Sequence, residues 1–113
     1  MNYFSSANFS EYIELTITTP RFDSNVSPLL KAELTKIFQE NPTHILINLS
    51  SSKYCDSTGL SVLLQAQRLC TQNGNKLIIF GVNEIIKSIF NVSKLNSVFQ
   101  IVTNKNEALE LLK

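Results

Sequence analysis

Two short apolar runs constrain the fold more than any other feature of the chain. They are HILINL at residues 44–49 and KLIIFGV at residues 76–82, and both are nearly continuous in apolar residues. Strands covered on both faces of a sheet have this pattern. The segment between them, from Ser57 to about Asn73, carries apolar residues at helical spacing. A strand, a helix and a strand in this order predict a parallel crossover, and such crossovers are nearly always right-handed.

The rest of the chain extends this pattern in both directions. The predicted elements are, in chain order, strands at 2–9 and 11–18, a helix from Ser27-Pro28 to a stop at Asn41-Pro42, a strand at 44–49, a helix from Ser57 to about Asn73, a strand at 76–82, a helix at 83–90, a strand at 98–102 and a helix at 106–113. This order predicts an α/β fold, with a mixed β-sheet of four to five strands and about four α-helices packed on it. At 113 residues the chain has room for one domain, residues 1–113.

Helical spacing also predicts which side chains each helix buries. The predicted buried stripes are Leu30, Leu34, Ile37 and Phe38 in the first helix, Leu60, Leu63, Leu64, Ala66 and Cys70 in the second, and Ile85, Ile86, Ile89 and Phe90 in the third.

Charge and hydropathy exclude several classes of function. Ten Lys and Arg are scattered against nine Asp and Glu, so the chain has no basic patch of the kind that binds nucleic acid. No window approaches the roughly 18 apolar residues that a membrane span needs. The N-terminus has neither a basic segment nor an apolar run of signal length. We therefore expect a cytoplasmic protein with reduced thiols.

The residues that most often carry catalysis or bind metals are few. Cys55 and Cys70 form no CxxC pair and have no His cluster beside them, so neither a zinc site nor a redox pair is predicted. His44, the single histidine, has no Ser or Cys partner in the sequence and is expected to be structural. Cys55 is expected to be a small buried residue. No phosphate-binding glycine motif occurs, and no cofactor or metal is predicted.

A phosphoryl-accepting receiver domain is one enzymatic alternative for an α/β chain of this size. Receivers hold Mg²⁺ with an acidic cluster at the end of the first parallel strand. That strand ends here in Thr18-Thr19-Pro20, and Asp23 stands alone in the following loop. A small hydrolase is a second enzymatic alternative, but the single histidine, His44, has no Ser or Cys partner in the sequence. Both enzymatic hypotheses are therefore weak.

The sequence Asp56-Ser57-Thr58-Gly59 begins the second helix. Asp56 or Ser57 can cap it, and such a cap is worth about 1 kcal/mol. Gly59 in the first turn costs about 0.5–1 kcal/mol relative to Ala, so its bare backbone suggests that another surface approaches Ser57 and Thr58. A helix N-terminus also favours a phosphate. The residues alone leave open whether these hydroxyls only cap the helix or carry chemistry.

The stretch HILINLSSSKYCDSTGLSVLLQAQRLCTQNGNKLIIFGV resembles the STAS domain of bacterial anti-sigma factor antagonists. In that family an apolar strand and a polar loop lead into Asp-Ser-Ser/Thr-Gly-Leu, a helix and another apolar strand. The resemblance covers nearly the whole chain. RFDSNVSPLLKAEL is similar to the family's loop and first helix, with Asp23 at the matching Asp, and NEIIKSIFNVSKLNSVFQI is similar to its third helix and last strand.

The resemblance implies a non-enzymatic partner switch. In the family, the unphosphorylated antagonist binds an anti-sigma factor, often itself a serine kinase, and frees the sigma factor. Phosphorylation of the Ser after the motif's Asp ends that binding, and a PP2C-type phosphatase restores it. Carried onto this chain, the acceptor is Ser57. The implied partner-binding residues are Asp23, Asp56, Ser57, Thr58, Gly59 and Leu60. The family is usually monomeric, and neither nucleic acid nor membrane is an implied partner.

Three departures from the family pattern leave the partner's identity open. Ser61 stands where a second Gly is common, Cys55 replaces an aliphatic residue or Met, and RFD at residues 21–23 replaces an acidic-aliphatic-Asp sequence. The main alternative is an unswitched STAS scaffold or adaptor in a sensory or lipid-trafficking complex, in which Ser57 is never modified.

Overall fold

In the described part of the chain, the main sheet has five strands. The computed structural model describes residues 3–113, so Asn2, where the first predicted strand begins, lies outside the described residues. The strand order is β1-β2-β4-β6-β7, with β1 antiparallel to β2 and all other pairs parallel. The strands are β1 (Phe4–Asn8), β2 (Tyr12–Ile17), β4 (His44–Asn48), β6 (Leu77–Phe80) and β7 (Gln100–Val102).

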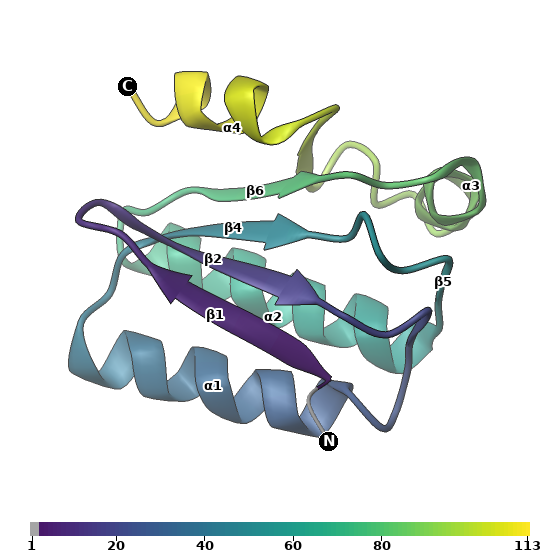
Figure 1. Cartoon of the computed structure of the whole chain (residues 1–113), viewed down its shortest axis with the longest axis horizontal. Helices are drawn as coiled ribbons and strands as arrows, with labels where there is room; N and C mark the ends of the chain where they lie inside the picture. Colours follow the sequence, from purple (N-terminus) through teal and green to yellow (C-terminus); the bar gives the residue numbers. More distant parts are fainter. Residues whose placement is uncertain (1–2) are drawn as a thin grey trace.

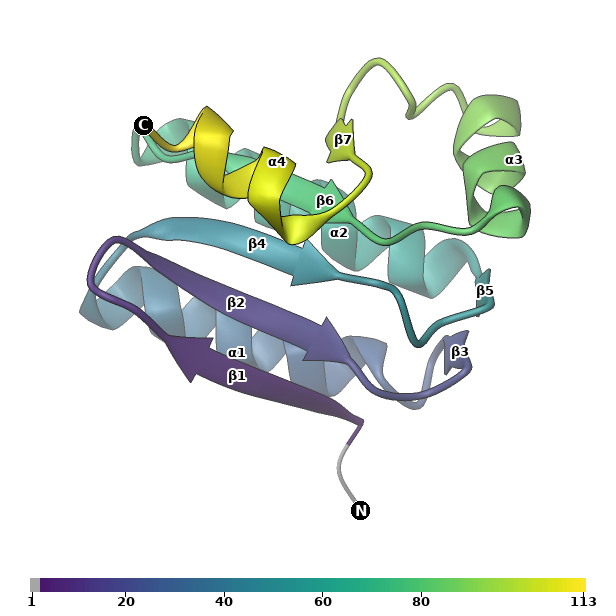
Figure 2. The ribbon, with the colours of Figure 1, turned by 45° about the horizontal axis from the view of Figure 1, so that its top comes forward.

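Within residues 3–113, four helices pack around this sheet, as predicted. They are α1 (Ser27–Glu40), α2 (Ser57–Gln72), α3 (Glu84–Val92) and α4 (Lys105–Leu111). Helices α1 and α2 cover one face of the sheet and α4 lies on the other, whereas α3 lies beyond the end at which the parallel strands finish (Figures 1 and 2). The α/β class and the mixed sheet are confirmed.

Apolar side chains cover both faces of the central strands. Ile45 and Ile47 of β4 belong to the larger core, between the sheet and helices α1 and α2, and Leu46 belongs to the smaller core under α4. All three are fully buried. All four residues of β6 are buried as well. The prediction that these two runs are strands covered on both faces is therefore confirmed.

The buried faces of α2 and α3 differ in part from the prediction. Val62 is buried in α2, whereas Leu64 is 37% exposed, and Ile85 of α3 is 55% exposed. The buried residues of α2 are Gly59, Val62, Leu63, Ala66 and Cys70. They form one narrow stripe at helical spacing. Leu64 lies ~100° around the helix axis from the buried Leu63, and so outside this stripe. Apolar content had placed Leu64 and Ile85 inside, but the orientation of each helix on its neighbours leaves them outside.

A second, two-stranded parallel ladder was not predicted. Strands β3 (Arg21–Phe22) and β5 (Tyr54–Cys55) pair beyond the carboxyl ends of the main strands, near α3 (Figure 2). Two residues are too short to show any hydrophobic period, which is why the pattern missed them. The ladder joins the segment before α1 to the segment before α2.

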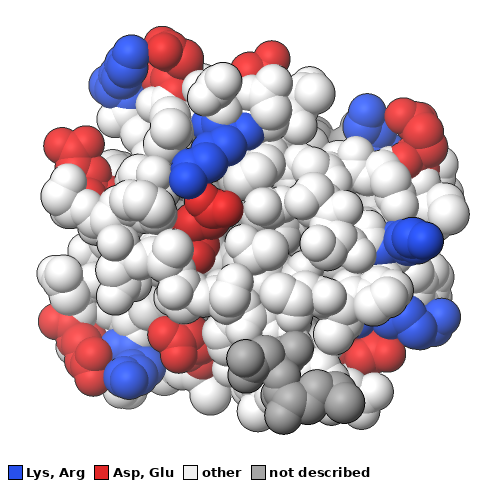
Figure 3. Space-filling model, viewed as in Figure 1, with Lys and Arg blue, Asp and Glu red and all other residues white. Residues whose placement is uncertain are grey.

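Surface charge is dispersed on the face seen in Figure 1. Lys and Arg are interspersed with Asp and Glu there and do not gather into one basic area (Figure 3). His44, at the start of β4, accepts a hydrogen bond through Nδ1 from the N–H of Lys76 at 2.9 Å, which is a structural role. Within residues 3–113, no helix combines the length and the apolar character needed to cross a membrane.

Candidate functional site

The start of α2 lies against the loop that precedes α1. The β3–β5 ladder pairs Phe22 with Cys55, and the N–H of Asp56 donates to the carbonyl oxygen of Phe22 at 3.2 Å. Asp23 follows Phe22 directly. Two segments more than 30 residues apart in sequence thus meet, and this junction brings Asp23 to the Asp-Ser-Thr-Gly sequence.

Asp56 is the N-cap of α2. Its Oδ1 accepts hydrogen bonds from the N–H of Thr58 at 2.9 Å and from the N–H of Gly59 at 3.1 Å. The Thr58 hydroxyl donates to the same oxygen at 2.6 Å. Burial alone would raise the pKa of Asp56, but these hydrogen bonds and the positive charge of Arg21 hold it below its ordinary value. The predicted cap is confirmed, and Asp56 provides it.

The Thr58 hydroxyl belongs to a network that joins α1 to α2. Besides donating to Asp56, its oxygen lies 3.1 Å from Oγ of Ser27. Ser27 is buried and its hydroxyl donates to the carbonyl oxygen of Asp23 at 2.9 Å. Thr58 therefore has structural partners on both sides.

The Ser57 hydroxyl, unlike that of Thr58, has no structural partner among residues 3–113. Ser57 is exposed, and within the described part of the chain its side chain makes no hydrogen bond. Because Asp56 caps the helix, Ser57 contributes nothing to the cap. Of the two hydroxyls in this motif, only that of Ser57 is open to an incoming group.

Gly59 has an internal reason for lacking a side chain. An added Cβ would lie 2.7 Å from Sγ of Cys55 and 2.7 Å from the carbonyl oxygen of Phe22. Gly59 is buried, so the surface that approaches it belongs to the protein itself. The expectation that its bare backbone serves an external partner is wrong on this point. The glycine lets α2 pack against the β3–β5 ladder.

The remaining predicted residues are Leu60 and Asp23. Leu60 is half-buried and packs against the larger core. The Asp23 carboxylate accepts the N–H of Asn25 at 3.0 Å and lies 3.7 Å from Nε of Arg21. Asp23 thus reaches the site, but its carboxylate already has partners.

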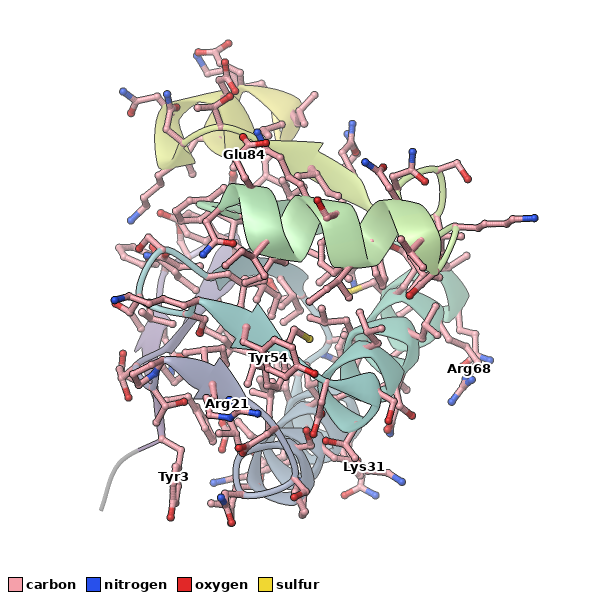
Figure 4. All side chains as sticks on the ribbon, turned by 90° about the vertical axis from the view of Figure 1, so that its right-hand side faces the viewer. Tyr3, Arg21, Lys31, Tyr54, Arg68 and Glu84 are labelled. Carbon is pink, nitrogen blue, oxygen red and sulfur yellow. The ribbon has the colours of Figure 1, made fainter. Side chains whose placement is uncertain are left out.

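Sequence patterns had not assigned a role to Arg21 or Tyr54. The Arg21 guanidinium lies over the Tyr54 ring, 4.6 Å from its centroid, and 65% of the Arg21 side chain is exposed (Figure 4). The two residues pair across the short ladder. In the sequence, Arg21 was notable only as a departure from the family pattern at residues 21–23. Its contact with Tyr54 depends on the pairing of β3 with β5.

The thiols and acidic groups form no reactive or metal-binding centre. Burial raises the pKa of Cys55 to about 12, with a further contribution from the Asp56 charge, and burial raises that of Cys70 to about 12. Cys55 is 1% exposed, as expected of a small buried residue. Among residues 3–113, no three His, Cys, Asp or Glu side chains gather as metal ligands would.

The sequence was compared with models of known protein families and with known proteins. The family model of the STAS domain matches residues 7–108, which include all of the site described above. The chain belongs to the STAS domain family. An anti-sigma-B factor antagonist of Staphylococcus aureus is 31% identical over 84 residues, 74% of each protein.

Solved structures share the STAS fold at low sequence identity. A crystal structure described as a putative anti-sigma factor antagonist from Thermotoga maritima superimposes with a TM-score of 0.88 at 17% identity, over 96% of this chain and 93% of that one. The Bacillus cell fate determinant SpoIIAA, in its phosphorylated form, superimposes with a TM-score of 0.76 at 15% identity, over 97% of this chain and 99% of that one.

Proposed function

We propose that this STAS domain is an anti-sigma factor antagonist, and that phosphorylation of Ser57 releases it from its anti-sigma factor. One observation carries the proposal: Ser57 is exposed, directly follows the capping Asp56, and its hydroxyl makes no hydrogen bond within residues 3–113. The names of the relatives support the antagonist role. The fold neighbour solved in a phosphorylated form supports the view that this fold accepts a phosphoryl group.

The proposed partners are an anti-sigma factor that is itself a serine kinase, and a PP2C-type phosphatase. In the kinase step, Oγ of Ser57 attacks the γ-phosphorus of ATP. An Oγ–P bond forms, the bond to the β,γ-bridging oxygen breaks, ADP leaves, and the hydroxyl proton passes to a base on the kinase. The phosphatase reverses the modification by hydrolysis. The domain itself supplies the acceptor and performs no catalysis.

The proposed binding surface surrounds Ser57 and consists of Asp23, Asp56, Ser57, Thr58 and Leu60. The buried Gly59 supports this surface by letting α2 pack against the β3–β5 ladder. A phosphoryl group adds about −1.5 to −2 charges at neutral pH. Under a partner, that charge loses water beside the Asp56 carboxylate, which is costly unless it is well paired. Turning a complex from mostly bound to mostly free takes about 5.5 kcal/mol of differential affinity, and a buried phosphate supplies a good part of it.

The same proposal places the protein in the cytoplasm as a monomer, with protein partners and neither nucleic acid nor membrane among them. A family model that covers residues 7–108 supports one STAS domain spanning residues 1–113.

The first experiment is intact-mass measurement and site mapping of the protein from its own host, grown in two conditions. A species heavier by about 80 Da, the mass of one phosphoryl group, is expected on Ser57 and is expected to change with growth condition. An unmodified Ser57 in every condition would contradict the switch and favour the unswitched scaffold or adaptor.

The second experiment measures binding of the purified kinase partner to two variants. Ser57→Ala is expected to bind like the wild type and to resist release when ATP is added. Ser57→Asp is expected to bind at least about tenfold more weakly, a loss of about 1.4 kcal/mol. Ser88→Asp is the matched control for charge, because Ser88 is also an exposed serine but lies in a different helix, α3. Equal weakening by both Asp variants would indicate general repulsion and not a switch at Ser57.

A further inference from the structure

A hollow of about 390 Å³ opens between the first turns of α1 and α2. Ser57 lies on its rim, together with residues from both helices. The residues that line it are Ser27, Pro28, Lys31, Ser57, Thr58, Ser61 and Val62. Four of the seven carry hydroxyls, one is a lysine and none is acidic. The hollow therefore contains one cationic side chain, several hydroxyls and no carboxylate.

Lys31 is the cation of this hollow and has no partner of its own. Within residues 3–113, its ammonium group takes part in no ion pair and no side-chain hydrogen bond. The Ser57 hydroxyl likewise makes no hydrogen bond to any residue that the structure describes. Two groups without partners, a cation and a candidate phosphoryl acceptor, thus line one hollow.

The other nearby cation is already engaged. Arg21 lies 3.7 Å from the Asp23 carboxylate and stacks on Tyr54. In Figure 4, Arg21 lies beside Tyr54, whereas Lys31 lies away from both, below and to the right. A phosphoryl group that turned toward Arg21 would also meet the carboxylates of Asp23 and Asp56. On the side of the hollow it meets no lining carboxylate.

We infer that Lys31 is the counter-ion of the phosphoryl group on Ser57, which lies in this hollow between α1 and α2. The inference rests on the proposed phosphorylation and adds its internal receptor. Lysine suits the role because its ammonium is a point charge on a long flexible stem, able to reach a phosphate in more than one position. Ser61 lies four residues after Ser57, on the same face of α2, so its hydroxyl donates to the same group.

The arrangement has a regulatory consequence. The phosphoryl group bridges the two helices and stays within a surface feature that already exists. Phosphorylation therefore changes the charge of the surface around the hollow without changing the fold. A partner that covers the first turns of α1 and α2 then meets a hollow already filled by the phosphoryl group.

The test uses the full chain with phosphoserine installed at position 57 by codon reassignment, so it requires no natural kinase. The second pKa of the phosphate is followed by phosphorus NMR in the wild type, in Lys31→Gln and in Lys36→Gln. Lys36 is the matched control, because it is exposed on the same helix but lines a separate hollow near the other end of α1.

Lys31→Gln is expected to raise the pKa of the phosphate by about 0.5, because an opposite charge nearby favours the dianion. Lys36→Gln is expected to change it by less than about 0.2, since a distant exposed charge is screened. Lys31→Arg, which keeps the charge, is expected to retain the wild-type pKa within about 0.2. Circular dichroism checks that each variant is folded.

Equal shifts in Lys31→Gln and Lys36→Gln would overturn the inference, as would a larger shift in Arg21→Gln than in Lys31→Gln. The proposed function is tested separately by adding the kinase partner to the phosphorylated wild type. If the phosphorylated protein binds the partner as tightly as the unmodified one does, the proposed release by phosphorylation is wrong. The NMR measurement tests the contact between Lys31 and the phosphate independently of that result.

Discussion

At the scale of single residues, neighbours decide what each hydroxyl at the start of α2 can do. Thr58 donates to Asp56 and lies against Ser27, so its role is internal. Ser57 comes one position earlier, is exposed and has no hydrogen-bond partner within residues 3–113. Similar chemistry in adjacent positions thus serves different purposes, because only the Thr58 hydroxyl contacts Asp56 and Ser27.

The cap provides the first prediction. Asp56→Ala removes the acceptor of three hydrogen bonds, so the free energy of unfolding at pH 7 is expected to fall by about 1–2 kcal/mol, measured by urea denaturation. The folded pKa of Asp56 is lowered, so its contribution is present above the ordinary value of 3.8 and is lost as pH falls through the folded pKa. The difference between wild type and variant should therefore shrink as the pH falls below 3.8. Glu110→Gln, on an exposed surface pair, is the control, and a difference independent of pH would contradict the cap.

Gly59 provides the second prediction. Gly59→Ala places a methyl group 2.7 Å from Sγ of Cys55 and from the carbonyl oxygen of Phe22, so unfolding is expected to become easier by about 1–3 kcal/mol. Truncating the neighbour in Gly59→Ala/Cys55→Ala should remove part of the clash. The double variant is then expected to lose less than the sum of the two single losses in chemical denaturation.

The control for this cycle is Ser61→Ala, an exposed position in the same helix, with an expected change within about 0.5 kcal/mol. Strict additivity of the Gly59 and Cys55 losses would contradict the steric account. A stable Gly59→Ala that failed only in partner binding would restore the external role first expected of this glycine.

At the scale of elements, the orientation of a helix separates apolar residues that look equivalent in sequence. Ile85 and Ile86 are neighbours in α3, but Ile86 is fully buried and Ile85 is 55% exposed. Ile86 and Phe90 form the buried face of α3, and Phe90 also contacts Phe99 with ring centroids 5.5 Å apart. These contacts hold α3 at the end of the sheet, near the β3–β5 ladder.

The third prediction compares this neighbouring pair. Ile86→Ala leaves a cavity in the core and is expected to cost about 2–5 kcal/mol of unfolding free energy, measured by thermal or urea denaturation. Ile85→Ala removes an exposed side chain and is expected to change stability by no more than about 0.5 kcal/mol. The two substitutions are chemically identical and adjacent, so each is the control for the other. Equal losses would show that α3 presents a different face to the core.

At the scale of the whole molecule, one layered unit protects both thiols. Cys55 is 1% exposed in the ladder and Cys70 is fully buried near the end of α2, and burial raises the pKa of each to about 12. Thiolate is the reactive form, so the native protein should be inert toward alkylation at neutral pH.

The fourth prediction follows from this protection. Iodoacetamide at pH 8 is expected to label neither thiol of the folded protein on the time scale in which both react in denaturant, as followed by intact mass. When labelling does occur, Cys55 and Cys70 should react together, because both require the same cooperative unfolding. Selective labelling of Cys55 would show that the β3–β5 ladder opens on its own.

The sequence by itself determined the helices, the strands of the main sheet and the start of the site, but not β3 and β5. Continuous apolar runs predicted β4 and β6, helical spacing predicted α1 and α2, and the polar residues before Leu60 predicted a capped helix start. These features depend on neighbours within a few residues, so a local pattern carries them. The assignment of Ser57 as the acceptor came from the resemblance to a family and not from local chemistry.

Only the tertiary structure decided which of these residues are free. The β3–β5 ladder, the contact of Gly59 with Phe22, the stacking of Arg21 on Tyr54 and the hollow shared by Lys31 and Ser57 each join segments about 26 to 37 residues apart. No short window of sequence contains both members of such a contact. The same reason explains Leu64 and Ile85: spacing showed that they were apolar on a helix, but the packing of one helix against its neighbours determined which side of it faces water.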